Sequence, residues 1–250
     1  MKVFRADLHT HTVLSPCGDL EMSPVNIVRI AKERGIDILG ITDHNSTLHA
    51  VLIKQLAEKK GIMVMMGAEV TTKEEVHCLC FFETEELLSE FQIYLDQHLP
   101  KIPNDTKYFG YQVVVNEEEE IVEEIDHLLI SALNQGINEL EQKVHQLKGL
   151  FIPAHINKTQ NSVISQLGFL PPDLQVDALE ISMHTTKEEF LSKNKYLKAY
   201  PFIQSSDAHY IDNIGNVCSR LRMKEASFSE IRMALKGEEG RSVELEERLR

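Results

Sequence analysis

The sequence contains few cysteines and no hydrophobic run as long as a membrane span. Two of its four cysteines, Cys78 and Cys80, are separated by one residue in an apolar stretch, which is neither a zinc-finger nor a redox spacing. We therefore expect reduced, mostly buried thiols. The N-terminus leads directly into a predicted strand rather than an apolar signal segment, so we expect a cytoplasmic protein with no membrane partner.

Motifs for several common catalytic mechanisms are also missing. The sequence has no Gly-x-Ser-x-Gly nucleophile elbow and no glycine-rich phosphate loop. The formal net charge of −13, from 26 basic and 39 acidic residues, argues against a broad surface for nucleic acid. No cluster of lysine and arginine marks a basic groove, and we infer no obligate protein partner.

Short apolar strands alternate with amphipathic helices, and this pattern predicts an α/β fold with a parallel sheet. About seven such strands in 250 residues favour a barrel. The first predicted strand begins near residue 3. The others span 36–41, 62–66, 76–82, 150–155, 178–182 and 202–209, with an accessory strand at 111–115. The predicted helices span 24–34, 48–60, 85–99, 117–135, 138–148 and 228–235. We expect one domain over 1–250, with a core at about 3–215 and a C-terminal helix and charged tail over 216–250.

Candidate ligands occur where these strands end. Asp7, His9 and His11 alternate along the first strand and therefore project from the same face. Because the carboxyl ends of barrel strands meet at one face, candidate ligands from other strands should join them. These are His44, Glu69, His155, Asp207 and His209. The histidines of the predicted helices are expected to be solvated; they are His49, His98, His127 and His145.

Imidazole combined with carboxylate, without a thiolate cluster, predicts zinc, manganese or iron rather than a structural cysteine site. A carboxylate such as Glu69 can bridge two cations, which an imidazole cannot do. More than six candidate ligands exceed the needs of one ion. The sequence therefore predicts a cluster of two or three divalent metal ions.

The ordered motifs of this chain resemble those of the PHP (polymerase and histidinol phosphatase) family. The matching segments are Asp7-Leu8-His9-Thr10-His11, Thr42-Asp43-His44, Ala68-Glu69, Val76-His77, Pro153-Ala154-His155 and Ser206-Asp207-Ala208-His209. The resemblance implies a distorted seven-stranded (β/α)7 TIM-like barrel of the PHP type, with a trinuclear metal cluster at its C-terminal face.

The resemblance also implies how the metal ligands are shared. His9, His11, Glu69 and Asp207 would hold one ion, and Glu69 would bridge to a second ion bound by His77 and His155. His44 and His209 would hold a third ion with one ligand from the loop after His11, either Asp19 or Cys17. We favour Asp19 because a hard ligand suits phosphate chemistry. The strand prediction alone does not support His77, because it puts this residue at the start of a strand.

A metal cluster lowers the pKa of a bridging water and so provides a hydroxide nucleophile, which predicts phosphoester hydrolysis. Asp7 and Asp43 are expected to orient imidazoles, the alternative being a simple strand-end hydrogen bond. Lys158 and His184 are candidates to contact substrate phosphate, and an ordinary surface role is the alternative for both. Glu180 lies in the middle of a strand and is interpreted as a satisfied core carboxylate.

Three functions remain open at this point. The first is a phosphoesterase acting on a small phosphorylated substrate such as a nucleotide, which the resemblance and the acidic composition favour. The second is a nuclease acting on short DNA or RNA ends, with a short oligonucleotide as substrate. The third is a non-catalytic, metal-binding regulatory domain, against which the nearly complete ligand set argues.

Overall fold

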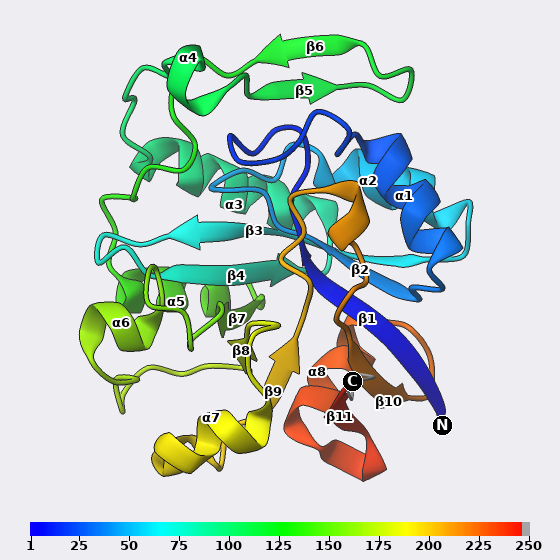
Figure 1. The fold of residues 1–250 in the computed structure, drawn as a ribbon, viewed down its shortest axis with the longest axis vertical. Helices are drawn as coiled ribbons and strands as arrows, with labels where there is room; N and C mark the ends of the chain where they lie inside the picture. Colours follow the sequence, from blue (N-terminus) through cyan, green and yellow to red (C-terminus); the bar gives the residue numbers. More distant parts are fainter. Residues whose placement is uncertain (247–250) are drawn as a thin grey trace.

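The computed structural model describes residues 1–246 and contains a curled seven-stranded sheet (Figure 1). Its strand order is β11-β10-β1-β2-β3-β4-β7. The strands are β1 (Lys2–Thr10), β2 (Ile38–Ile41), β3 (Met63–Thr71), β4 (His77–Phe82), β7 (Leu150–Pro153), β10 (Ser219–Met223) and β11 (Ser242–Leu245). Two small sheets pair β5 (Val113–Val115) with β6 (Ile121–Glu124), and β8 (Leu179–Ile181) with β9 (Phe202–Gln204). The predicted α/β fold with a distorted TIM-like barrel is confirmed.

Helices α2 (Ala50–Glu58), α3 (Glu85–His98), α5 (Ile137–Gln146) and α8 (Phe228–Lys236) pack apolar residues against strands of this sheet. In α1 (Pro24–Glu33), Ser23 caps the first turn and Ile27, Val28 and Ala31 are buried, as the sequence predicts. The other α-helices are α4 (Thr106–Phe109), α6 (Val163–Leu167) and α7 (Lys187–Lys193). Three 3-10 turns are η1 (Lys195–Leu197), η2 (Ile211–Asn213) and η3 (Glu238–Gly240).

The expectation that all strands of the main sheet run parallel is wrong. Strands β1, β2 and β3 are parallel, but β4 is antiparallel to both of its neighbours, β3 and β7. The reversal of β4 places its first residue, His77, opposite Thr71 at the end of β3. A residue at the start of β4 therefore lies at the same edge of the sheet as the ends of β2 and β3.

The helix predicted over 117–135 is also wrong, since this segment forms β6 and the loop that follows it. The side-chain oxygen of Asn116 accepts hydrogen bonds from the N–H groups of Glu118 and Glu120, at 3.1 and 2.8 Å, and closes a turn. Such local hydrogen bonds compete with a helix. Ile121 and Val122, two of the residues that gave the helical pattern, are 66% and 61% exposed. The β5–β6 hairpin lies along one end of the molecule (Figure 1).

The C-terminal segment contributes to the main sheet in a way that the sequence did not indicate. The predicted helix near 228–235 is α8, but β10 and β11 flank it, and β10 pairs with β1. The sheet therefore does not end near residue 215. Residues 247–250 of the predicted charged tail lie outside the described residues, and the single-domain boundaries stay a prediction. Within residues 1–246, no helix combines the length and apolar character that crossing a membrane needs.

Candidate metal centre

The site forms at the carboxyl end of β1, where His9 and His11 project side by side. Both side chains are buried, and their Nε2 atoms lie 3.1 Å apart. Two imidazole nitrogens this close cannot both carry a proton without repulsion, so at least one presents a lone pair. The same-face alternation predicted for this strand is what brings the two rings together.

Glu69, in β3, lies at the centre of the cluster and is 1% exposed. Five imidazole nitrogens surround its carboxylate. Its Oε1 atom lies 3.0 Å from His77 Nδ1, 3.1 Å from His155 Nε2 and 3.3 Å from His9 Nε2; its Oε2 atom lies 3.2 Å from His44 Nδ1 and 3.4 Å from His11 Nε2. Each carboxylate oxygen thus faces a different set of rings, as a carboxylate that bridges two cations does.

These imidazoles come from four separate strand ends. His44 follows β2 and forms an isolated bridge with Glu69, while His77 reaches the cluster because β4 is reversed. His155 follows β7 and has a positive φ of 29°. A non-glycine residue in this backbone region is strained, and such strain concentrates at functional sites.

Asp207 and His209 follow β9 and close the cluster on another side. Asp207 Oδ1 lies 3.4 Å from His9 Nε2 and 3.6 Å from His11 Nε2, and its backbone φ is +53°. Its other carboxylate oxygen forms an ion pair with Lys158. The structure therefore places Lys158 at the cluster, where an ammonium group can face an anionic substrate.

Glu180, in β8, orients His9 and lies within the site rather than only in the core. It is 1% exposed, accepts a hydrogen bond from His9 Nδ1–H at 3.0 Å, and accepts another from the backbone N–H of His155 at 3.0 Å. The donation fixes the orientation of the ring, with Nε2 facing the cluster. Sequence reasoning missed this role because the alternation of β8 does not reveal which ring Glu180 meets.

Asp43 is linked to His11 through Ser15, a residue that is not among the candidates from the sequence. Ser15 Oγ donates to Asp43 Oδ1 at 2.7 Å and accepts from His11 Nδ1–H at 3.0 Å. The backbone N–H of Thr12 also donates to Asp43, at 2.7 Å. The contacts of Asp43 thus fit the predicted orienting role, with Ser15 as the link.

Asp7 makes the strand-end hydrogen bonds that were the alternative to the orienting role predicted for it. Its two oxygens accept from the backbone N–H groups of Ser206 at 2.9 Å and Gly215 at 2.7 Å, rather than from an imidazole. Burial raises the pKa of this fully enclosed carboxyl. Asp7 therefore holds in place the segment that carries Asp207 and His209.

The loop after His11 brings Cys17, and not Asp19, to the ligand cluster. The Sγ atom of Cys17 and one ring nitrogen each of His11, His44 and His209 all lie within 4.8 Å of one another. The carboxylate of Asp19 instead accepts a hydrogen bond from the backbone N–H of Glu21 at 2.9 Å. The preference for Asp19 is not supported by this geometry, because the Cys17 thiol, and not the Asp19 carboxylate, lies among the imidazole nitrogens.

His184 and His49 both differ from their predicted environments. His184 is exposed, and its backbone N–H donates to Ser182 Oγ, so the structure does not bring its ring into the cluster. His49, expected to be solvated, is fully buried: its Nδ1–H donates to Thr12 Oγ1 at 2.7 Å, and its Nε2 accepts from the N–H of Val115 at 2.9 Å. His49 thus connects the ligand-bearing loop with the β5–β6 hairpin.

The chemistry of the cluster fits divalent cations. Two groups of donors besides the Cys17 group could each hold an ion, namely His9 with His11 and Glu69, and His44 with Glu69 and His77. The Nδ1 atom of His155 is buried without a hydrogen-bond partner among the described residues, and His44 Nδ1, although 3.2 Å from Glu69 Oε2, makes no hydrogen bond of good geometry. Buried polar atoms are rarely left unpaired, so these two atoms are consistent with a site for cations.

For two of the candidate ligands, Glu69 and His209, the charge state is the one that binds cations. Burial alone would raise the pKa of Glu69, but the surrounding imidazoles, led by His77 and His9, hold it well below its usual range. Burial, together with the neighbouring His11, lowers the pKa of His209 to about 4. A carboxylate that stays ionised and an imidazole that stays neutral are the forms that bind cations.

Three known proteins show what the chain is similar to. The uncharacterized protein YqxK of Bacillus subtilis is 26% identical over 275 residues, which cover 97% of this chain and 64% of YqxK. The crystal structure of the lesion-specific endonuclease PfuEndoQ from Pyrococcus furiosus matches with a TM-score of 0.75 at 22% sequence identity. The match covers 97% of this chain and 58% of the endonuclease chain. Endonuclease Q in complex with a 27-mer duplex, with an abasic lesion at the active site, matches with a TM-score of 0.72 at 21% sequence identity. This match covers 96% of this chain and 58% of the endonuclease chain.

The structural similarities establish the fold, and the sequence profile establishes the family. At identities below 25%, the two endonuclease structures show a shared fold alone. The chain spans less than two-thirds of the length of each of the three proteins. The sequence profile of the PHP domain matches residues 7–166, more than half of the chain, and includes the ligand-bearing ends of β1, β2, β3 and β7. The chain therefore belongs to the PHP domain family.

Proposed function

We propose that the protein is a metal-dependent phosphoesterase that works at a cluster of two or three divalent ions. One observation supports this most directly: a single buried carboxylate, Glu69, faces five imidazole nitrogens at 3.0–3.4 Å. Such a concentration of ligand groups costs stability unless cations bind it, because buried polar groups need partners. The family membership supports the same conclusion.

In this proposal the ligands divide among three positions. His9, His11, Glu69 and Asp207 would hold the first ion, and Glu69, His77 and His155 the second. His44, His209 and Cys17 would hold the third, with Cys17 replacing Asp19 as the loop ligand. A thiolate is a softer ligand than a carboxylate and favours zinc at that position over manganese.

Bound cations would supply a water of lowered pKa and positive charge opposite the phosphoryl oxygens. The residues of this chain do the remaining work. Glu69 and Asp207 keep the site anionic enough to retain several cations, and Glu180 and Ser15 fix the rings of His9 and His11. Lys158 pairs with Asp207 and can turn to a substrate phosphate oxygen.

A nucleic acid phosphodiester is the second candidate for the substrate, beside a small phosphate ester. The structural similarity to endonuclease Q, whose complex holds duplex DNA with a lesion at the active site, favours it. The net charge of −13 favours a short end or a locally unpaired strand over a long duplex. A non-catalytic metal-binding role is the third, and the complete cluster argues against it.

A phosphoester panel with metal-loaded and metal-stripped protein tests the proposal. The panel contains aryl phosphates, histidinol phosphate, nucleoside mono- and bisphosphates, and short oligonucleotides. We expect hydrolysis of at least one class, loss of turnover on chelation, and loss of turnover in His9→Ala and Asp207→Ala. The control Asp19→Asn should keep its activity. Full activity after the metal has been stripped would contradict the mechanism.

A further inference from the structure

Exposed aromatic side chains lie on a segment that borders the loop carrying Cys17. Tyr108 is 82% exposed, Phe109 42% and Tyr111 58%. A Cβ atom built on Gly110 would lie 4.0 Å from the carbonyl oxygen of Pro16, the residue before Cys17. Large exposed aromatic side chains gathered beside a reactive centre are unusual unless they contact something. We call residues 108–111 the aromatic segment.

The aromatic segment is held firmly in this position. The side chain of Asp105 caps α4 by accepting from the N–H of Lys107 at 3.0 Å, and Asn104 Nδ2 donates to the carbonyl of Gly110 at 2.9 Å. The fully buried Gln112, next in the chain, donates to the carbonyl of His127 at 2.7 Å and accepts from the N–H of Leu129 at 2.8 Å. Rings on an anchored backbone lose little freedom when a ligand stacks on them.

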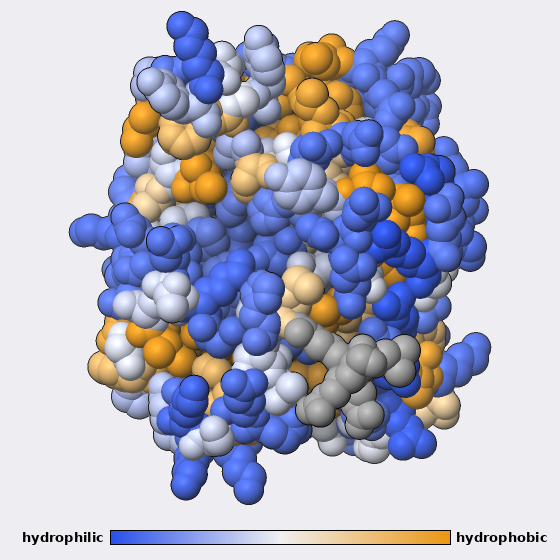
Figure 2. Space-filling view, viewed as in Figure 1, coloured by the Kyte–Doolittle hydropathy of each residue, from blue (hydrophilic) through white to orange (hydrophobic). Residues whose placement is uncertain are grey.

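The adjoining hairpin is attached directly to the ligand-bearing loop. Val13 forms a small buried cluster with Val113 and Val115, and His49 joins Val115 to Thr12. Figure 2 shows hydrophobic side chains over this end of the molecule, beside a hydrophilic band across the middle. The aromatic segment therefore keeps a fixed distance from the metal ligands.

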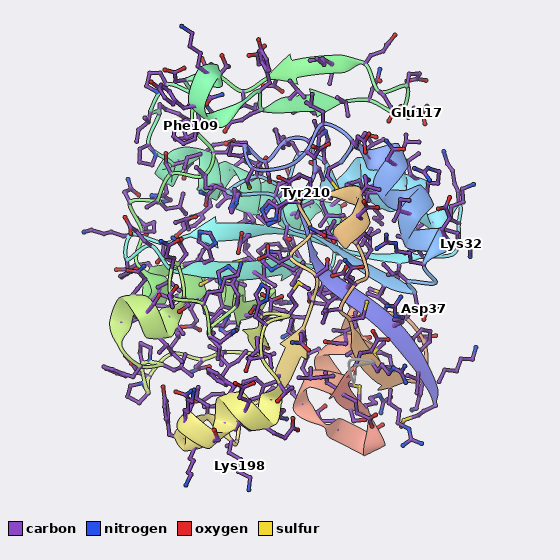
Figure 3. All side chains as sticks on the ribbon, viewed as in Figure 1. Lys32, Asp37, Phe109, Glu117, Lys198 and Tyr210 are labelled. Atoms are coloured by element: carbon purple, nitrogen blue, oxygen red, sulfur yellow. The ribbon has the colours of Figure 1, made fainter. Side chains whose placement is uncertain are left out.

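A further exposed aromatic residue lies on another side of the same loop. Tyr210 directly follows the candidate ligand His209 and is exposed, and the N–H of Asp19 donates to the carbonyl of His209 at 2.9 Å. In Figure 3 Tyr210 lies near the centre of the face and Phe109 towards its edge. The loop from Ser15 to Asp19 thus has aromatic residues on two sides.

Resting on the proposed phosphoesterase function, we propose that the aromatic segment is a stacking surface for an unpaired base of single-stranded nucleic acid whose phosphate lies at the metal centre. Every base offers a π-face, and stacking on a protein aromatic ring contributes about 1–3 kcal/mol per base. Lys107, in the same turn, supplies a positive charge for the neighbouring phosphate. Because the chain is acidic overall, the metal centre and stacking, rather than a basic surface, must provide most of the affinity.

The absence of tryptophan from the sequence provides a site-specific probe. Tyr108→Trp and Tyr111→Trp each introduce the only tryptophan, and Tyr196→Trp, on the exposed η1 turn, is the matched control. Metal-loaded protein is titrated with a short phosphorothioate oligonucleotide, which is cleaved slowly, and with the same oligonucleotide made of abasic residues. We expect the base-containing strand to quench emission at positions 108 or 111 and not at 196, and the abasic strand to quench at none of them.

Equal quenching at all three positions, or none at 108 and 111, would overturn the stacking surface. So would equal quenching by the abasic strand. As a second measurement, replacing Tyr108, Phe109 and Tyr111 together by alanine should raise the KM for oligonucleotides about 5- to 150-fold, from the loss of one stacked base. The KM for an aryl phosphate should not change. An unchanged KM for both substrates would also refute the proposal.

The two proposals fail in different ways. Hydrolysis of aryl phosphate without base-dependent quenching leaves the phosphoesterase function standing and refutes the stacking surface. Base-dependent quenching with no hydrolysis of any phosphoester refutes the function and leaves a nucleic acid-binding surface. Quenching by a protein or peptide partner instead of the oligonucleotide would assign the aromatic segment to a protein interface and overturn the inference.

Discussion

At the scale of single residues, the candidate metal ligands are oriented by neighbours that are not themselves candidate ligands. Glu180 fixes the proton of His9 on Nδ1, and Ser15, held by Asp43, does the same for His11. Both rings thereby direct their Nε2 atoms toward the cluster. Such supporting hydrogen bonds raise the basicity of the ligand and remove the freedom of the ring to turn.

We predict that Glu180→Gln weakens metal binding without unfolding the protein. Glutamine keeps the size of the side chain but removes the negative charge that faces His9 Nδ1–H. The expected loss of metal affinity is about 10- to 100-fold, the effect usual for groups that orient a ligand. Competition with a chromophoric chelator measures it, and the exposed Glu188→Gln serves as control. An affinity equal to wild type would show that Glu180 is only a core carboxylate.

The ligand role proposed for Cys17 gives a second prediction. Cys17→Ala should lose one equivalent of metal, while Asp19→Asn should lose none, because the Asp19 carboxylate binds the backbone of Glu21. Elemental analysis of the three proteins purified in parallel gives the stoichiometry. In a cobalt-loaded sample, the thiolate-to-cobalt absorption should be present in wild type and absent from Cys17→Ala. Loss of metal from the Asp19 variant alone would restore Asp19 as the ligand.

The clustering of the strand-end residues could be predicted from the sequence, and the residues around them could not. His9, His11 and His44 are candidates because each lies at the carboxyl end of an apolar run, and the structure brings their rings together. The choice between Cys17 and Asp19 depends on which side chain of the loop lies near the imidazoles, and the role of Glu180 depends on which ring a neighbouring strand supplies. Such contacts join residues that are far apart in the sequence.

At the scale of elements, two features explain where the sequence was misleading. The sequence of an apolar strand does not indicate whether the strand runs parallel or antiparallel to its neighbour. The reversal of β4, and with it the position of His77, could therefore not be predicted from the sequence. In residues 117–135, a helical pattern of apolar residues coincides with a turn built on the side chain of Asn116. There the local hydrogen bonds decided the structure, and the periodicity did not.

His49 should stabilise the protein by joining the β5–β6 hairpin to the loop after β1. His49→Ala leaves the buried N–H of Val115 without an acceptor and removes a donor to Thr12. We expect the free energy of unfolding to fall by about 1–3 kcal/mol, the cost of an unpaired buried polar group. Urea denaturation measures the change. The exposed His184→Ala should stay within about 0.5 kcal/mol of wild type, and equal stability of both variants would contradict the attachment.

The ion pairs of His145, in α5, should make the stability of the protein depend on pH. Its ring lies between Asp177, at 3.1 Å, and Glu141 of the same helix, and the hydrogen bond with Asp177 is the main reason that its pKa is raised. A histidine whose pKa is raised by folding stabilises fully below its unfolded pKa of about 6.5. This stabilisation is lost as the pH rises through the folded pKa.

The stability difference between wild type and His145→Gln should therefore shrink as the pH rises above about 6.5. Because the ring is partly exposed, we expect a difference of about 1 kcal/mol at acidic pH. Denaturation midpoints of both proteins across this range measure it. A difference that grows with pH, or that is constant, would show that the charged ring does not stabilise the fold.

At the scale of the whole molecule, the net charge of −13 limits how a nucleic acid can bind. A protein that neutralises six to ten phosphates loses about 10³- to 10⁵-fold in affinity between roughly 50 and 200 mM salt. A binding mode that relies on the metal centre and on stacking should lose less than about tenfold over the same range. Oligonucleotide binding measured by anisotropy checks this, and a loss of a thousandfold would reveal a basic surface that the account does not contain.

The central claim is that Glu69 and imidazoles from separate strand ends bind several cations together. Elemental analysis of the purified protein, beside Glu69→Gln prepared in the same way, tests it most directly. Glutamine preserves the shape of the side chain but cannot bridge two cations as a carboxylate does. We expect two or three divalent ions per wild-type chain and at most one in Glu69→Gln. A wild-type protein that hydrolyses phosphoesters without metal, or a variant with the full wild-type complement, would contradict it.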